Sequence, residues 1–362
     1  MKITAMEVLP CEQRLGDPSW KFARAAVPRL EGQLLILRDD QGHEGLGYAH
    51  AIPSITTHGG GAHASLEWLR PHLLGQDPRD IGPLMDDIDA RLASNTSVKA
   101  AVDMALHDLV ARALGVPVHV LLGGAYRRSV ALSRVLAIKP PAQMAAKAAE
   151  LTAQGYRHLK LKLSGDTALD VQRIAAVRDA AGADTALTLD PNQSYSAKQM
   201  MVAFARMERY DIALVEQPVP AADWEGLALL TRSLPVQVEA DESAQTVQDV
   251  LRLVNGRMVD VINLKITKLG GVRRFLEAVR ICEAGNVLCR VGAAFGPALL
   301  QAMALQAACA VRALPLACEL AEHEHLLDDP FTPLPVVNGQ LELPAGPGCG
   351  VALLRPAASA SS

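Results

Sequence analysis

The chain has 362 residues, of which 50% are hydrophobic and 20% are charged, which predicts a folded globular protein of about two domains and excludes a disordered chain or a disulfide-stapled mini-protein. Its 35 basic and 39 acidic residues give a net charge of -4 at pH 7. This balance offers no basic surface for nucleic acid or for a membrane, so we expect a small molecule as partner.

The six cysteines form no Cys-x-x-Cys motif of the kind that binds zinc or exchanges disulfides, and we expect them to be reduced thiols of the core. Residues 1–7 contain charges and no apolar secretory signal, which predicts a cytoplasmic protein. The uncharged run 291–311 is long enough to span a bilayer. Because Gly296 and Pro297 interrupt it, we expect a strand end, a turn and a buried helix instead.

The first third of the chain shows mixed patterns. Residues 3–9 and 34–37 read as strands, with glycines between the segments as turn residues. A helix is predicted after Asn95, with an apolar stripe that ends before Gly115. These elements predict a small α+β unit up to about residue 120.

From about residue 130, short β-branched or leucine-rich runs alternate with alanine-rich helical stretches, the pattern of repeated βα units. From the second run onward the predicted strands end every 24 to 28 residues, and eight such strands close a TIM-type barrel. No clean helical period follows the eighth strand, so its helix is expected to be missing or replaced. The predicted strand ends are Arg134, Lys162, Asp190, Glu216, Asp241, Lys265, Val291 and Glu319.

The catalytic groups of such a barrel lie at the C-terminal ends of its strands. Side chains alternate along a strand, so Lys160 and Lys162 share one face. Three ionised carboxylates at neighbouring strand ends need a cation, and oxygen ligands suit Mg²⁺. The predicted metal ligands are Asp190, Glu216 and Asp241.

A substrate carboxylate on this metal, with a lysine on each side, is suited to removal of the proton from the adjacent carbon, because metal and cations neutralise the charge that develops. The lysine that accepts the proton must be neutral. The like charge of Lys160 favours loss of a proton from Lys162, so we expect the pKa of Lys162 to lie well below the usual ~10.4.

With these motifs the chain resembles the enolase superfamily, in the mandelate racemase and muconate lactonizing enzyme family and its muconate cycloisomerase-like subgroup. The likeness runs nearly end to end and rests on an ordered set of motifs. They are Lys160-Leu161-Lys162, Asp190-Pro191-Asn192, Glu216-Gln217-Pro218, Ala240-Asp241-Glu242-Ser243 and Leu264-Lys265-Ile266-Thr267-Lys268-Leu269-Gly270-Gly271. The resemblance implies a (β/α)7β modified TIM barrel over residues 126–330. It also implies an α+β N-terminal capping domain over residues 1–125, completed by the tail from about 331 to 362.

The resemblance also implies a Mg²⁺ cofactor, for which Mn²⁺ can substitute, a small carboxylate as substrate, and a homo-oligomer. Lys162 is implied as the base on one face of the substrate, with Lys160 as its electrostatic partner. Lys265 is implied as acid or base on the other face, because it lies 24 residues after Asp241, where the subgroup has its catalytic lysine. Lys268 leads into the next helix.

Other polar residues near the strand ends are assigned by position. Asn192 and Glu242 are expected to orient the ligands and lysines. Dipeptide epimerases of the subgroup usually have Asp-x-Asp on the eighth strand, whereas this chain has Glu319-Leu320-Ala321, which is closer to the cycloisomerases. The run 323–325 is interpreted as a solvated loop and not as a metal site. Possible substrate contacts are Ser133, Arg134, Arg290 and Glu319.

We therefore predict an isomerase that removes a proton next to a carboxylate through an enediolate. It is either a racemase or epimerase of an amino-acid derivative or a muconate-type cycloisomerase. The alternative is a lyase that expels a β-hydroxyl group from a hydroxy acid or a hydroxyproline-like substrate. More distant alternatives are a Schiff-base aldolase with Lys265 as nucleophile and a non-catalytic metal-binding scaffold.

Overall fold

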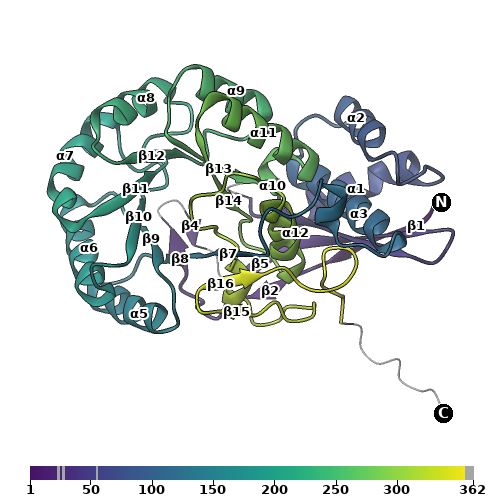
Figure 1. Ribbon diagram of the computed structural model, residues 1–362, viewed down its shortest axis with the longest axis horizontal. Helices are drawn as coiled ribbons and strands as arrows, with labels where there is room; N and C mark the ends of the chain where they lie inside the picture. Colours follow the sequence, from purple (N-terminus) through teal and green to yellow (C-terminus); the bar gives the residue numbers. More distant parts are fainter. Residues whose placement is uncertain (23–24, 27–28, 54–55, 355–362) are drawn as a thin grey trace, which may run out of the picture.

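The computed structural model describes residues 1–22, 25–26, 29–53 and 56–354. Its N-terminal part is an antiparallel sheet with helices on one side, drawn in purple and blue in Figure 1. The strands of this sheet are β1 (Ile3–Pro10), β2 (Gln13–Arg14), β5 (Arg29–Asp39) and β6 (Glu44–Ala51), and β3 (Lys21–Phe22) and β4 (Ala25–Ala26) form a separate two-stranded sheet. The helices are α1 (Gly59–Leu73), α2 (Ile81–Arg91), α3 (Thr96–Ala113) and α4 (Val118–Leu121).

The predicted early strands and the predicted helix are present. Strand β5 lies in the middle of the sheet and pairs with β1 on one side and β6 on the other. Helix α3 is buried along most of its length, because it lies against the sheet and also against the barrel. Strand β6 and helix α3 approach closely at Gly47, where a Cβ atom would lie 1.9 Å from the carbonyl oxygen of Ala101.

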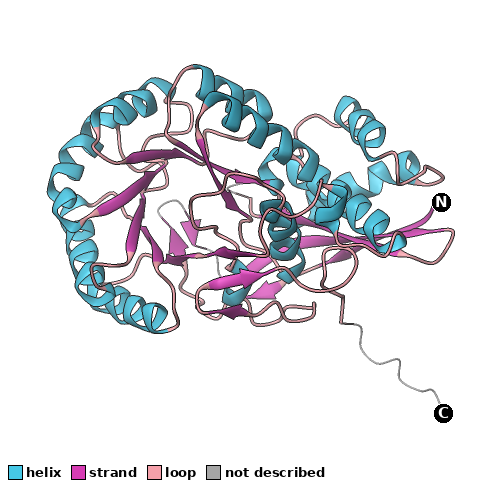
Figure 2. Cartoon of the chain, in the orientation of Figure 1, coloured by secondary structure: helices cyan, strands magenta, loops and turns pink. Residues whose placement is uncertain are grey.

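The rest of the chain alternates strand and helix as predicted, and Figure 2 shows the helices outside a ring of strands. The strands are β7 (Ser129–Ala131), β8 (Ser133–Leu136), β9 (His158–Lys162), β10 (Ala186–Asp190), β11 (Ile212–Glu216), β12 (Gln237–Ala240), β13 (Val261–Lys265) and β14 (Leu288–Gly292). The helices are α5 (Pro141–Ala153), α6 (Thr167–Ala181), α7 (Ala197–Met207), η1 (Glu208–Tyr210), α8 (Trp224–Ser233), α9 (Val247–Asn255), α10 (Ile266–Leu269), α11 (Val272–Gly285) and α12 (Ala298–Cys309). Strands β8 to β14 pair in parallel in chain order.

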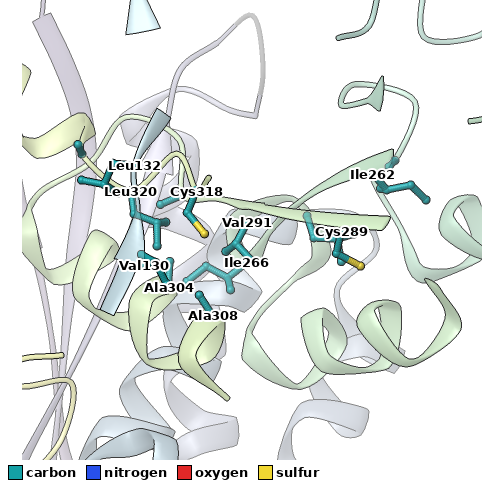
Figure 3. Close-up of a cluster of buried hydrophobic side chains, with 14 of the residues drawn as sticks. Val130, Leu132, Ile262, Ile266, Cys289, Val291, Ala304, Ala308, Cys318 and Leu320 are labelled. Carbon is teal, nitrogen blue, oxygen red and sulfur yellow. The ribbon is translucent and has the colours of Figure 1, made fainter. Parts of the chain in front are cut away.

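The eighth strand is short and closes the barrel between β8 and β14. Cys318 forms a parallel bridge with Leu132, and Glu319 forms one with Gly292. Figure 3 shows Cys318 in the hydrophobic cluster that contains Leu132 and the α12 residue Ala304. A short helix, η2 (Glu322–His325), follows where an eighth barrel helix would start. The predicted (β/α)7β barrel, with its eighth helix replaced, is therefore confirmed.

The C-terminal tail returns to both parts of the molecule. Strand β16 (Gln340–Glu342) pairs with β7 and with β15 (Val336–Val337). Farther along, the carbonyl oxygen of Gly348 accepts a hydrogen bond from Val118 N at 2.9 Å. The buried carboxylate of Asp108 on α3 accepts bonds from Cys349 N at 2.7 Å and from Leu46 N at 3.0 Å. Residues 355–362, the end of the tail expected to complete the N-terminal part, lie outside the described residues.

The uncharged run 291–311 forms the end of β14 and helix α12, as predicted. Within the described part of the chain, no helix has the length and hydropathy needed to span a membrane. All six cysteines are among the described residues, and each is buried and free of disulfides.

Candidate active site

A cavity of about 290 Å³ lies where the barrel strands end and the N-terminal part covers them. The barrel contributes lysines and carboxylates from its strand ends, together with Phe295 after β14. Trp20, His50 and Ile52 of the N-terminal part close the cavity from the other side. Charged groups are therefore gathered in a cavity with partly apolar walls.

Strand β9 positions Lys160 and Lys162 on the inner face of the barrel, as predicted. Leu159 and Leu161, which alternate with them, point outward and are fully buried. The ammonium group of Lys160 lies 3.0 Å from Glu216 Oε2 and 3.2 Å from Asp190 Oδ2. Lys162 Nζ lies 2.5 Å from the same Asp190 oxygen. The two lysines thus share a carboxylate partner.

The other end of the site is built around Asp241, which follows β12 directly. Lys265, the last residue of β13, contacts Asp241 Oδ2 at 2.6 Å. Lys268, in the short helix α10, contacts Asp241 Oδ1 and the carbonyl oxygen of Asn263. The motif spacing placed only Lys265 in the site, and the structure adds Lys268, because one turn of helix returns its side chain toward the strand ends.

Electrostatic attraction in the site overcomes the cost of burial. Burial alone would lower the pKa of Lys160, but Glu216 and Glu319 raise it well above its usual value. Burial would raise the pKa of Asp241, but Lys265 and Lys268 hold it well below its usual range. The positive charge of Lys160, on which the expectation for Lys162 rested, is thus itself paired with carboxylates, and that expectation stays a prediction.

Asn192 and Glu242 lie beside these groups. Asn192 N donates to Asp190 Oδ1 at 3.0 Å, and the Asn192 amide donates to Glu242 Oε1 at 3.3 Å. Among the described residues, Asn192 Oδ1 and Glu242 Oε2 are buried without a hydrogen-bond partner. Asn192 can therefore orient Asp190, Glu242 holds the Asn192 amide, and each still presents an acceptor to another group.

Gln217 fixes the loop that carries Asp241. Its side-chain oxygen accepts hydrogen bonds from Asp241 N and Ser243 N, each at 3.0 Å. Its own backbone has a positive φ of 35° at the end of β11, an unfavourable conformation for a residue with a Cβ atom. This strain marks a place where the fold holds the chain to keep the strand-end groups in position.

The three proposed metal ligands are shielded from solvent. Asp190 and Glu216 are fully buried and Asp241 is 6% exposed. The described residues hold no group of three such side chains already arranged around one metal position, because lysines occupy the carboxylates in this conformation. Together with Asp190 and Glu216, the described residues that line the cavity nevertheless carry six carboxylates against four lysines. Counted as ionised, these groups carry a formal surplus of two negative charges on hard oxygen ligands, which fits a divalent cation such as Mg²⁺. Burial and the neighbouring Glu319 raise the pKa of Glu216 well above its usual value, as expected where carboxylates are crowded.

Of the four predicted substrate contacts, one lines the cavity and three do not. Glu319 lines the cavity, where its carboxylate lies 2.7 Å from Lys160 Nζ and 3.1 Å from Arg290 Nη1. Arg290 and Ser133 are buried and are not among the residues that line the cavity. Arg134 is also absent from the lining and donates instead to the carbonyl oxygen of Ala321. Only Glu319 of the four is therefore placed to meet a ligand in this structure.

The run 323–325, interpreted as a solvated loop, is exposed at Glu324 but half-buried at His323 and His325, and it forms part of the short helix η2. The ring of His325 packs 4.4 Å from the ring of Trp20, and Nε2 of His325 is 2.9 Å from Arg134 Nη1. His323 contacts the carbonyl oxygen of Leu334. None of the three is among the described residues that line the cavity, whereas Glu322, directly before them, is.

Comparison with known proteins decides the family. Residues 11–123 match the mandelate racemase/muconate lactonizing enzyme N-terminal domain, and residues 143–357 match the enolase C-terminal domain-like family. This chain belongs to the mandelate racemase/muconate lactonizing enzyme family. The resemblance stated from the sequence motifs is thereby confirmed.

Individual relatives are isomerases. The chain is 36% identical to muconate cycloisomerase 1 of Rhodococcus opacus over 293 residues, which are 79% of this chain and 78% of that protein. The structure of a substrate-liganded L-Ala-D/L-Glu epimerase from Bacillus subtilis superposes with a TM-score of 0.93 at 31% identity, and the match covers 97% of this chain and 99% of that one. A dipeptide epimerase from Enterococcus faecalis complexed with Mg and L-Leu-L-Tyr has a TM-score of 0.93 at 30% identity, with 97% and 100% covered.

The family fixes the class of chemistry. This chain is an isomerase of the enolase superfamily, whose Mg-dependent racemases, epimerases and cycloisomerases act by removing a proton next to a carboxylate. The predicted enzyme class is thus confirmed.

Proposed function

We propose that this protein racemises or epimerises an amino-acid derivative, with Mg²⁺ held by Asp190, Glu216 and Asp241 and with Lys162 and Lys265 as the two bases. The observation that carries the proposal is the placement of these lysines. They end β9 and β13, which are the second and sixth strands of an eight-stranded barrel and therefore lie across it from each other. Each contacts a different carboxylate of the proposed metal site, Asp190 or Asp241.

The residues of the chain perform the proton transfers. When bound, the metal neutralises the negative charge that develops on the substrate carboxylate. Lys162 Nζ takes the proton from one face of the adjacent carbon, and Lys265 Nζ returns a proton to the opposite face, which inverts the centre. Lys160 remains a buried cation beside Asp190 and Glu216 and adds positive charge where the substrate carboxylate is bound.

A second candidate is muconate-type cycloisomerisation, which needs proton transfer on one face only. It is favoured by Glu319-Leu320 on the eighth strand and by the similarity to a muconate cycloisomerase. Racemisation needs a lysine on each face and cycloisomerisation needs one, so the substrate and the dependence on Lys265 distinguish the two candidates.

The finer properties of the protein are also proposals. We propose a division into a capping domain over residues 1–125 and a barrel over residues 126–330, supported by a separate hydrophobic core within the N-terminal part. We propose a cytoplasmic homo-oligomer that accepts a small carboxylate. The cytoplasmic location is supported by six cysteines that are all free thiols.

The test is α-proton exchange in D₂O with Mg²⁺, followed by NMR over N-acyl amino acids, dipeptides, proline derivatives and unsaturated diacids. We expect Lys162→Ala and Lys265→Ala each to reduce exchange at least ~100-fold, the contribution of a positioned base. Lys198→Ala on the exposed surface of α7 is the control and keeps full activity. Exchange that depends on Lys162 alone would favour cycloisomerisation or elimination. Exchange that survives in both variants would contradict the proposal.

Mg²⁺ dependence is measured separately. If the metal balances the surplus of carboxylates, saturating Mg²⁺ stabilises the protein, by about 2.7 kcal/mol at 100 times its Kd. A melting temperature that is unchanged by Mg²⁺ and by chelator would argue against the site.

A further inference from the structure

One buried carboxylate in the cavity has no role in the proposed proton transfer. Glu322, the first residue of η2, is 5% exposed and lines the cavity. Its Oε1 atom is buried without a hydrogen-bond partner among the described residues. A buried carboxylate without a partner costs folding free energy, so such a group is expected to meet a ligand.

The neighbouring residues do not satisfy Glu322. His325 Nε2 lies 3.5 Å from Glu322 Oε2, but the same nitrogen is 2.9 Å from Arg134 Nη1. Because arginine only donates hydrogen bonds, Nε2 must accept, and it therefore has no proton for Glu322. Arg134 itself is turned toward the Ala321 carbonyl oxygen and toward Glu324, whose Oε2 is 3.6 Å from Nη2.

Two aromatic rings that contact each other, one from the N-terminal part and one from the barrel, line the same cavity. The rings of Trp20 and Phe295 are 5.3 Å apart and nearly perpendicular, and both residues line the cavity with Glu322. Aromatic faces attract cations, and they give an ammonium group an apolar wall that excludes water. His325, whose Nε2 lies 3.5 Å from Glu322 Oε2, packs against both rings, at 4.4 Å from Trp20 and 5.6 Å from Phe295, so the carboxylate and the rings lie in one part of the cavity. Such an environment is suited to a positive charge and opposed to a second negative one.

We propose that Glu322, together with Trp20 and Phe295, binds a cationic group of the substrate, so that the substrate class is a carboxylate with a distal ammonium or similar cation. This inference rests on the proposed function, because it takes the lysine and carboxylate cluster as the place where the reacting carboxylate binds. It favours amino-acid derivatives over unsaturated diacids, since Glu322 repels a second carboxylate.

The test is calorimetric binding to the Mg²⁺-saturated protein with two matched pairs of probes. One pair is L-alanyl-L-leucine and its N-acetyl form, and the other is Nα-acetyl-L-lysine and Nα,Nε-diacetyl-L-lysine. The unmodified protein is expected to bind the charged member of at least one pair about tenfold or more tightly. In Glu322→Gln that preference falls to less than about threefold, and binding of cis,cis-muconate becomes tighter.

Glu324→Gln is the matched control, because Glu324 lies in the same short helix but outside the cavity lining, where Tyr156 donates to it. It is expected to keep the preference for the charged probe. Equal binding within both pairs, or a preference that survives in Glu322→Gln, would overturn the inference. Binding needs no turnover, so failure here is distinguishable from failure of the proposed proton transfer, which is seen only as lost exchange.

Discussion

Replacement of Glu319 by Gln is expected to destabilise the barrel although the shape of the side chain is kept. Glu319 is 4% exposed and lies 2.7 Å from Lys160 Nζ and 3.1 Å from Arg290 Nη1. Burial alone would raise its pKa, but these two cations hold the pKa far below its usual range, so the folded protein favours the ionised form. Removing the charge therefore removes a net stabilising interaction.

The size of the effect follows from the partners that remain. Lys160 keeps Glu216 and Asp190, and Arg290 keeps Glu239 at 3.1 Å, so neither cation is left alone. We therefore expect a loss of about 3 kcal/mol, the lower end of the roughly 3–5 kcal/mol for breaking a buried pair. For a chain of 362 residues, at roughly 2.1 cal/mol/K per residue, this corresponds to a melting temperature lower by about 4 °C.

Scanning calorimetry at pH 7, with Mg²⁺ and with chelator, measures this change. Glu225→Gln, at an exposed position of α8, is the control and is expected to melt within about 1 °C of the unmodified protein. A Glu319→Gln protein that melts with the control, or above it, would refute the reasoning, since the buried ions would then contribute nothing to stability.

Three further predictions concern other parts of the molecule. Burial, with a smaller effect of Lys265, lowers the pKa of His50 to about 4. Between pH 6.5 and 4 the unfolded chain therefore binds a proton that the folded chain does not, and the stability of the protein decreases as the pH is lowered through this window. In urea unfolding, the decrease in stability from pH 7 to pH 4 should be smaller in His50→Gln than in the unmodified protein, by up to about 3 kcal/mol. Gly47→Ala should lower the free energy of unfolding by about 1–3 kcal/mol in the same assay, because the added Cβ atom meets a backbone oxygen of α3. Gly60→Ala, at an exposed position of α1, is the control and should not lower it. Equal stabilities of the two variants would contradict the close packing of β6 on α3. Burial raises the pKa of Cys11 and Cys318 to about 12, so a thiol reagent at pH 8 should label all six cysteines only after denaturation, and rapid labelling of the native protein would argue against the buried positions.

The barrel could be predicted because its strands are short, buried and evenly spaced. The spacing of Lys160 and Lys162 was enough to place both on one face, since alternation along a strand is a local property. The approach of strand ends in a barrel also brought Asp190 and Glu216 to Lys160, and Asp241 to Lys265, as the contacts show. Strand boundaries shifted by up to two residues: β8 ends at Leu136 and not near Arg134.

The remaining site residues depend on contacts that no local pattern encodes. Arg134 lies on a strand that is buried on both faces, so its burial pattern does not reveal which way the side chain points. Trp20 and His50 enter the cavity only because the N-terminal part packs over the barrel. Glu322 follows the eighth strand by three residues, and the replacement of the eighth helix by a short turn is what brings it to the cavity.

The hydrogen bonds of Asp108 have a consequence for the order in which the protein folds. This carboxylate is fully buried in α3, yet one of its donors is the backbone of Cys349, near the end of the chain. During synthesis the N-terminal sheet and α3 leave the ribosome long before Cys349 has been made. Until then the Asp108 carboxylate lacks this hydrogen bond. The N-terminal part is thus expected to reach its native packing only after the last strand of the barrel has been made. The whole molecule is therefore expected to complete its folding after synthesis of the chain, and not domain by domain during it.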